Sequence, residues 1–195
     1  MIDKNVYDAL KNKFSSTSSW AVWASPENGN WRSKDSISDL SCLVESPELL
    51  EQLTGDYIFV GLNPASHNVI DTGEPWSAFH SGDTKRAQDY KLRYALRGTE
   101  FWGSFMTDIY TGIVETAAQQ AINKASPEVT RNSIANLLEI RNILGTHSTI
   151  VAMGSKAYRI LMKELPEDVE LKKIHHFSDR VNIDTYRMEV LEQLR

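Results

Sequence analysis

YIFVGLNPAS, residues 57–66, is a short apolar run that stops abruptly at an asparagine and a proline. A run of this length, bounded by turn residues, predicts a strand that is buried on both faces. Proline keeps the residue before it out of the helical region, so Asn63-Pro64 predicts a turn directly after the strand. The turn either serves only to redirect the chain, or it presents the Asn63 side chain at the strand's end.

The amino-acid composition limits the class of protein to which this chain can belong. The chain has 195 residues, of which 41% are hydrophobic and 24% charged, as expected for one ordinary globular domain. The single cysteine, Cys42, allows no disulfide and is typical of a reducing compartment. The first residues lack an apolar segment of signal-peptide length, and no run of about eighteen apolar residues occurs. We therefore predict a cytoplasmic protein with no membrane association.

Four apolar segments predict strands, and helical patterns separate most of them. Strands that alternate with helices predict a parallel sheet covered on both faces. We therefore predict an α/β fold, a three-layer α/β/α sandwich with a short, mainly parallel four-stranded sheet. The expected strands are 57–62, 104–110, 149–153 and 169–177.

The clearest helix, 127–144, has Ser126 as N-cap, proline at its first position and Gly145 at its end. Trp20 and Trp23, three residues apart, are expected on one helical face in the core. Residues 1–195 are predicted to form a single domain, on which a helical N-terminal region, 1–54, packs. Further helices are expected at 3–14, 36–53 with an interruption near Pro47, 87–97, 155–164 and 183–194.

A long polar segment, 65–103, follows the first strand, and loops longer than about fifteen residues are commonly functional or disordered. Within it, 83–97 predicts a basic helix although the net charge of the chain is −5. Tyr90 and Tyr94 on this helix suit stacking against nucleic acid and equally suit packing on the core. The cations of this segment are Lys85, Arg86, Lys91, Arg93 and Arg97.

The carboxyl ends of parallel strands meet at one edge of a sheet, where ligands bind in folds of this kind. Asn63 follows the first strand, Asp108 ends the second, Gly154-Ser155 follows the third and 175–178 ends the fourth. We expect these polar groups to surround one cleft.

Four blocks of the sequence resemble the uracil-DNA glycosylase superfamily, nearest its mismatch-specific uracil/thymine branch. VGLNPAS at 60–66 is similar to the first active-site motif, and IVAMGSKAYRIL at 150–161 to the third-strand segment. FWGSFMTDIY at 101–110 occupies the place of the second strand, and HHFSDR at 175–180 that of the second motif. The resemblance covers residues 56–180 and implies the fold of these enzymes.

The resemblance also implies roles for individual residues. Asn63 would position water against the sugar carbon while the bond to the base breaks. His176 would hold the oxygen of the departing base, whose negative charge backbone N–H groups near Leu62 and His176 would stabilise. Phe79 would stack on the extruded base.

For DNA binding, the resemblance implies that Ser178 grips the phosphate backbone and that Arg180 enters the vacated stack. Lys85 and Arg86 are the cations expected to contact DNA. No cofactor is implied, and we predict a monomer. Asp71, Glu74, His80 and Asp83 match no compact ligand spacing, so we predict no metal site.

Two residues depart from the family pattern. Phe177 stands where the second motif has proline, which changes the expected shape of the loop that carries Ser178. Asp108 stands where some branches place an asparagine that reads uracil, and an ionised carboxylate only accepts hydrogen bonds. Asp108 would therefore repel uracil O4 and suit an exocyclic amine, as on cytosine or adenine, unless Thr107 faces the pocket instead.

The sequence therefore leaves three hypotheses of function. The first is a DNA base-excision N-glycosylase in which Asn63 positions the water. The second is a catalytically inactive nucleobase- or nucleic-acid-binding protein of the same fold. The third is a hydrolase of free nucleosides or nucleotides, which the acidic charge of the chain suits better than a duplex.

Overall fold

A computed structural model describes residues 1–64, 74–80, 82 and 85–195, and shows an α/β fold built on a mostly parallel sheet. The sheet has five strands in the order β1-β3-β2-β4-β5. Strands β2 to β5 run parallel, and only β1 pairs antiparallel, with β3. The strands are β1 (Ser19–Trp20), β2 (Tyr57–Gly61), β3 (Phe105–Asp108), β4 (Thr149–Met153) and β5 (Leu171–Ile174).

The four predicted strands are present, but the expected number of strands was wrong because β1 adds an edge strand. Trp20 lies in β1 and is fully buried, with its ring edge-on to Phe105 at 4.9 Å. A two-residue strand is too short to produce the alternation from which strands are predicted. The expectation that Trp20 and Trp23 share a helical face is therefore also wrong, although both side chains are buried in the core.

Three helices of the second half of the chain, 127–144, 155–164 and 183–194, have the predicted bounds, and capping side chains mark the starts of two of them. Ser126 caps α5 by accepting from Val129 N, and Asn182 caps α7 by accepting from Asp184 N. The sequence did not predict α4, whose N-cap, Ala117, offers no side-chain hydrogen bond. The helices are α1 (Lys4–Phe14), α2 (Pro47–Gln52), α3 (Tyr90–Leu96), α4 (Ala118–Lys124), α5 (Pro127–Leu144), α6 (Ser155–Glu164) and α7 (Ile183–Leu194), with a 3-10 turn at Ser41–Leu43.

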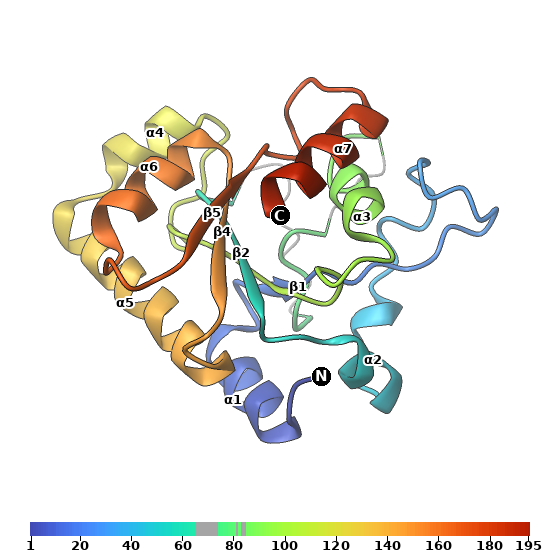
Figure 1. Ribbon diagram of the computed structural model, residues 1–195, viewed down its shortest axis with the longest axis horizontal. Helices are drawn as coiled ribbons and strands as arrows, with labels where there is room; N and C mark the ends of the chain where they lie inside the picture. The colour runs from blue at the N-terminus through green and yellow to red at the C-terminus, as the bar shows by residue number, and fades with distance from the viewer. Residues whose placement is uncertain (65–73, 81, 83–84) are drawn as a thin grey trace.

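Helices cover both faces of the sheet and form three layers (Figure 1). On one face, Ile58 and Ile150 pack in a cluster that includes α5 and α6, whereas Phe59 and Val151 on the other face pack with α3 and α7. Successive residues of a strand point to opposite faces, which explains this division. Within the described residues, no helix is long and apolar enough to cross a membrane.

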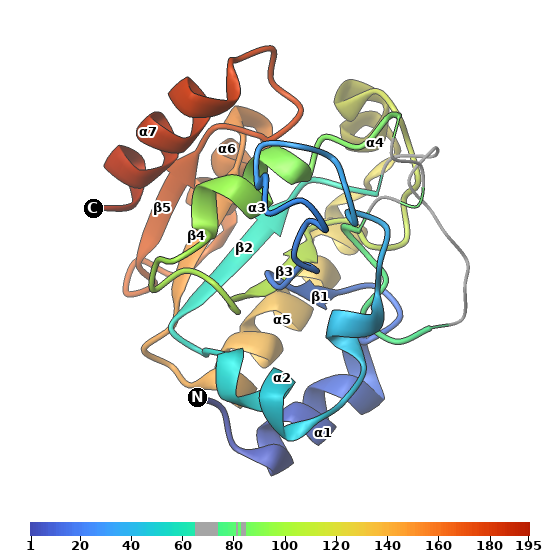
Figure 2. The ribbon, with the colours of Figure 1, turned by 90° about the vertical axis from the view of Figure 1, so that its right-hand side faces the viewer.

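The N-terminal region is part of the core. Tyr7 and Leu10 of α1 and Leu49 of α2 are buried in the same cluster as α5. Figure 2 shows α1 and α2, in blue and cyan, near the start of β2 and away from the end to which its arrow points. These helices therefore support the sheet near the start of β2.

Candidate functional site

A cavity with a volume of about 590 Å³ lies at the carboxyl ends of β2, β3, β4 and β5. The helices after β2 and β4 pack on opposite faces of the sheet, so the cavity opens where ligands bind in open α/β sheets. Seven of the nine residues predicted for the site line it. They are Leu62, Asn63, Phe79, Arg86, Asp108, His176 and Ser178.

The turn after β2 fixes the amide group of Asn63. Its Nδ2 donates hydrogen bonds to Pro64 O at 2.9 Å and to Glu115 O at 2.7 Å, which uses both of its hydrogens. The loop after β3 is held beside this turn, because Tyr110 N donates to Leu62 O at 2.9 Å. The Asn63 carbonyl oxygen is left as an acceptor at the wall of the cavity.

Hydrogen bonds also fix the tautomer of His176. The backbone N–H of Ser178 lies 3.1 Å from His176 Nδ1 and can only donate, so Nδ1 is an acceptor. The Ser178 hydroxyl lies 2.7 Å from the same nitrogen. Burial lowers the pKa of His176, which keeps the ring neutral with its proton on Nε2. His176 therefore presents a neutral N–H donor at the cavity wall.

A glycine allows His176 to approach the end of β4. Gly154 has a φ of 93°, and a Cβ at this position would lie 3.3 Å from His176 Cβ. The backbone N–H of His176 donates to Asp179 Oδ2 at 3.2 Å. This N–H is therefore already bound to a carboxylate oxygen, and the imidazole Nε2–H is the donor of His176 that remains.

Asp108 ends β3 beside Gly61, its partner in the register of β2 and β3. A Cβ on Gly61 would lie 2.2 Å from Asp108 Oδ1 and 3.5 Å from Phe79 Cε1, so the carboxyl and the ring both border this glycine. Among the described residues, nothing forms a hydrogen bond or ion pair with the Asp108 carboxyl. Burial raises its pKa to about 7. Thr107 does not line this cavity, and its hydroxyl accepts a hydrogen bond from Ser18 Oγ at 3.0 Å.

The backbone of Phe79 has a φ of 68°, which is rare for a bulky residue. Trp76, also at positive φ, anchors the segment: its N–H donates to Ser15 O, and its Nε1 donates to Tyr7 Oη at 2.9 Å. Trp76 is fully buried, so the helix α1 positions the segment that brings Phe79 to the cavity.

Phe177, where the resemblance implies proline, is buried in the core cluster formed with α7. Its ring stacks on the His176 ring with centroids 4.3 Å apart. The turn after it is closed by the bond from Asp179 N to His176 O, and α3 holds it through the bond from Lys91 Nζ to Asp179 O. Phe177 thus replaces proline with a packed side chain that supports the imidazole.

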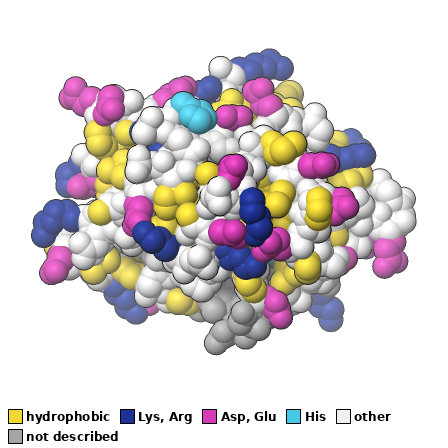
Figure 3. Space-filling view, turned by 90° about the horizontal axis from the view of Figure 1, so that it is seen from below, with side chains coloured by type: hydrophobic (Ala, Val, Ile, Leu, Met, Phe, Trp, Pro, Cys, Tyr) yellow, Lys and Arg dark blue, Asp and Glu magenta, His cyan; other side chains and the backbone are white. Residues whose placement is uncertain are grey.

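Two of the five cations of the predicted basic helix, 83–97, are buried. Arg93 is fully buried and donates to the carbonyls of Ser33 and Asp35, and Lys91 is buried as well. Lys85 and Arg180 are exposed and do not line the cavity. The face in Figure 3 carries acidic and basic side chains intermixed.

Sequence reasoning missed several cavity residues. Ser16 and Thr17 follow α1, Thr111 and Glu115 follow β3, and Lys156 lies in the first turn of α6. Glu115 contributes the backbone carbonyl that holds Asn63, and a backbone acceptor leaves no signal in a sequence.

The described residues contain no group of three or more His, Cys, Asp or Glu side chains that could hold a metal ion. Asp71 and Asp83, considered above, lie outside the described residues, as do Ala65 and Ser66 of the first block. The site described here is therefore made of an amide, a neutral imidazole, a carboxyl and an aromatic ring.

Comparison with models of protein families gave no match to this chain, and a comparison with curated proteins found none that it resembles in sequence.

Proposed function

We propose that this protein is a base-excising N-glycosylase of the uracil-DNA glycosylase type, acting on a nucleotide turned out of DNA. The observation that carries the proposal is the fixed amide of Asn63 on the same cavity as the neutral donor His176. Phe79 on that cavity supplies a ring against which a base can stack.

In the proposed reaction, the Asn63 carbonyl oxygen accepts a hydrogen bond from a water and holds it against the sugar carbon. An amide cannot remove a proton at neutral pH, so the bond to the base breaks before the water attacks. The sugar carbon becomes cationic and the base leaves as an anion. His176 Nε2–H donates to the oxygen or nitrogen on which that charge develops.

Hydrolysis of a free nucleoside or nucleotide is the second candidate. The charges around the cavity favour it: among the described residues, Asp108, Glu115 and Asp179 line it together with two cations, Arg86 and Lys156. A DNA backbone is bound mainly by cations, so this lining is less suited to a duplex than to a small molecule.

The test uses end-labelled oligonucleotides that each carry one altered or mismatched base: uracil, hypoxanthine, xanthine, mismatched thymine or an alkylated base. Abasic sites are then cleaved with alkali, and free nucleosides are assayed in parallel. Strand breaks that disappear with Asn63→Ala and persist with Asn123→Ala, an exposed asparagine of α4, are the expected result. Breaks that survive Asn63→Ala would contradict the proposed role of Asn63, and release of base from nucleosides alone would favour the second candidate.

A further inference from the structure

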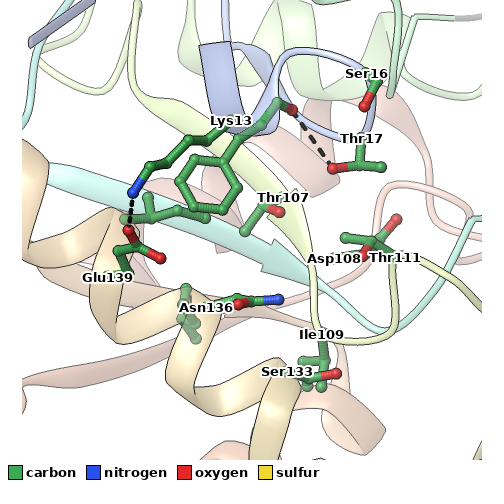
Figure 4. Close-up of a pocket in the computed structure, with 13 residues that line it drawn as sticks. Lys13, Ser16, Thr17, Thr107, Asp108, Ile109, Thr111, Ser133, Asn136 and Glu139 are labelled. Carbon is green, nitrogen blue, oxygen red and sulfur yellow. Dashed lines mark hydrogen bonds and ion pairs between the residues drawn. The ribbon is translucent and has the colours of Figure 1, made fainter. Parts of the chain in front are cut away.

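A second cavity, with a volume of about 410 Å³, adjoins the first between α1, the end of β3 and α5. Four residues line both cavities: Ser16, Thr17, Asp108 and Thr111. All four have short side chains, so only a thin partition separates the two spaces. Figure 4 shows the second cavity, with Asp108 and Thr111 on one side and Asn136 extending toward them from α5.

The lining of the second cavity is polar and nearly uncharged. Within the described residues, the side chains of Ser16, Thr111, Ser133 and Asn136 make no hydrogen bond, so their donors and acceptors are available. Of its three ionisable residues, Asp108 is shared with the first cavity, and Lys13 and Glu139 form an ion pair with each other at the far side (Figure 4). This chemistry fits a neutral polar group that carries hydroxyl or amide functions.

The position of Asp108 relates this cavity to the first. A base that stacks on Phe79 has its edge near Asp108, because both residues border Gly61. An ionised carboxylate accepts a hydrogen bond from an exocyclic amine of the base. If that amine carries one substituent, its remaining N–H still donates to Asp108 and the substituent extends past the partition, toward Thr111 and Asn136.

We propose that the second cavity is a subsite for a polar substituent on the exocyclic amine of the base, so that the preferred substrates are N-substituted adenine or cytosine bases. This inference rests on the proposed function, because it takes the first cavity to be the base pocket. It adds to that function a substrate class, namely bases that carry a substituent on the exocyclic amine. A pocket that had room only for an unsubstituted base would exclude them.

The experiment measures the affinity of the protein for free bases by calorimetry at pH 8.5. Adenine is compared with N6-(2-hydroxyethyl)adenine, and cytosine with N4-(2-hydroxyethyl)cytosine. We expect the substituted base of at least one pair to bind about tenfold tighter than its parent, the effect of one or two added hydrogen bonds. Asn136→Phe fills the second cavity and should remove this gain while parent binding stays unchanged. Asn132→Phe, on the same helix but outside both cavities, should keep the gain.

Asn136→Ala serves as a second variant, because it removes the amide without adding bulk and should reduce the gain only. Three results would each overturn the subsite. The first is that both parent bases bind as tightly as their substituted forms, or more tightly. The second is that none of the four bases binds, and the third is that the gain survives Asn136→Phe. The glycosylase assay on oligonucleotides is read separately. If strand breaks occur but the substituted bases bind no tighter than their parents, the subsite alone is refuted. If the substituted bases bind tighter but no strand breaks occur, the glycosylase alone is refuted.

Discussion

The Asp108 carboxyl occupies the space above Gly61 into which the Cβ of any other residue at position 61 would project. The two residues are partners in the register of β3 and β2, and Oδ1 would lie 2.2 Å from that Cβ. Gly61 therefore sets how closely the carboxyl can approach the strand that carries Asn63. The glycine that breaks the apolar run 57–62 is explained by this approach.

Gly61→Ala should displace the Asp108 carboxyl and destabilise the protein by about 1–3 kcal/mol, as overpacking of a dense site does. We expect a lower melting temperature and a loss of base binding of at least about tenfold. Gly112→Ala is the matched control, since a Cβ at Gly112 meets nothing within 4 Å. Equal melting temperatures for the two variants would contradict the close approach.

Asp108→Asn should change the pH dependence of stability. The folded protein holds the Asp108 proton up to about pH 7, whereas the unfolded chain releases it near 3.8, so stability is lost as the pH rises between these values. The asparagine variant avoids this loss and should be more stable than wild type at pH 8 by up to about 4 kcal/mol. Urea unfolding at pH 4 and pH 8 measures the difference, which should be small at pH 4. A difference that does not grow with pH would show that the carboxyl ionises freely.

The neutral form of His176 should persist below the ordinary histidine pKa, because burial lowers the pKa of this ring. NMR of ¹⁵N-labelled protein should show an imidazole with its proton on Nε2 at pH 7 and little protonation at pH 6. The spectrum of His176→Gln assigns the signal. A proton on Nδ1 would contradict the acceptor role that the Ser178 N–H gives this nitrogen.

Tyr7→Phe should leave the buried Trp76 Nε1–H without its acceptor, at a cost of about 1–3 kcal/mol. Thermal unfolding measures this loss. Base binding should fall as well, because the Trp76 segment carries Phe79 into the cavity. Tyr57→Phe is the control, since the Tyr57 hydroxyl makes only a long 3.4 Å bond to Glu100 at the surface. Equal stability of the two variants would show that the bond to Trp76 contributes nothing.

The sequence predicted the parallel strands and the helices α5, α6 and α7 because their signals are local. Ser126-Pro127 and Gly145 mark the ends of α5, and β2 and β4 are short runs of mostly apolar residues. The edge strand β1 and the helix α4 were missed, since two residues show no period and Ala117 provides no cap.

The residues at strand ends were also predictable, because the carboxyl ends of parallel strands must meet. Asn63, Asp108 and His176 therefore line one cavity. Contacts between distant segments were not predictable. The burial of Arg93 under the carbonyls of Ser33 and Asp35 depends on how a loop folds back, and a count of positive charges in 83–97 cannot show it.

The walls of the first cavity come from nearly the full span of the chain, from Ser16 after α1 to Asp179 after β5. During synthesis on the ribosome, α1 emerges long before the β5 strand that must close the same cavity. The pocket can therefore be completed only after residue 179 has been added. A nascent chain that ends before residue 176 has the Asn63 turn but lacks His176 on the opposite wall, so a ligand that needs both residues can bind only after the first three parallel strands have been made.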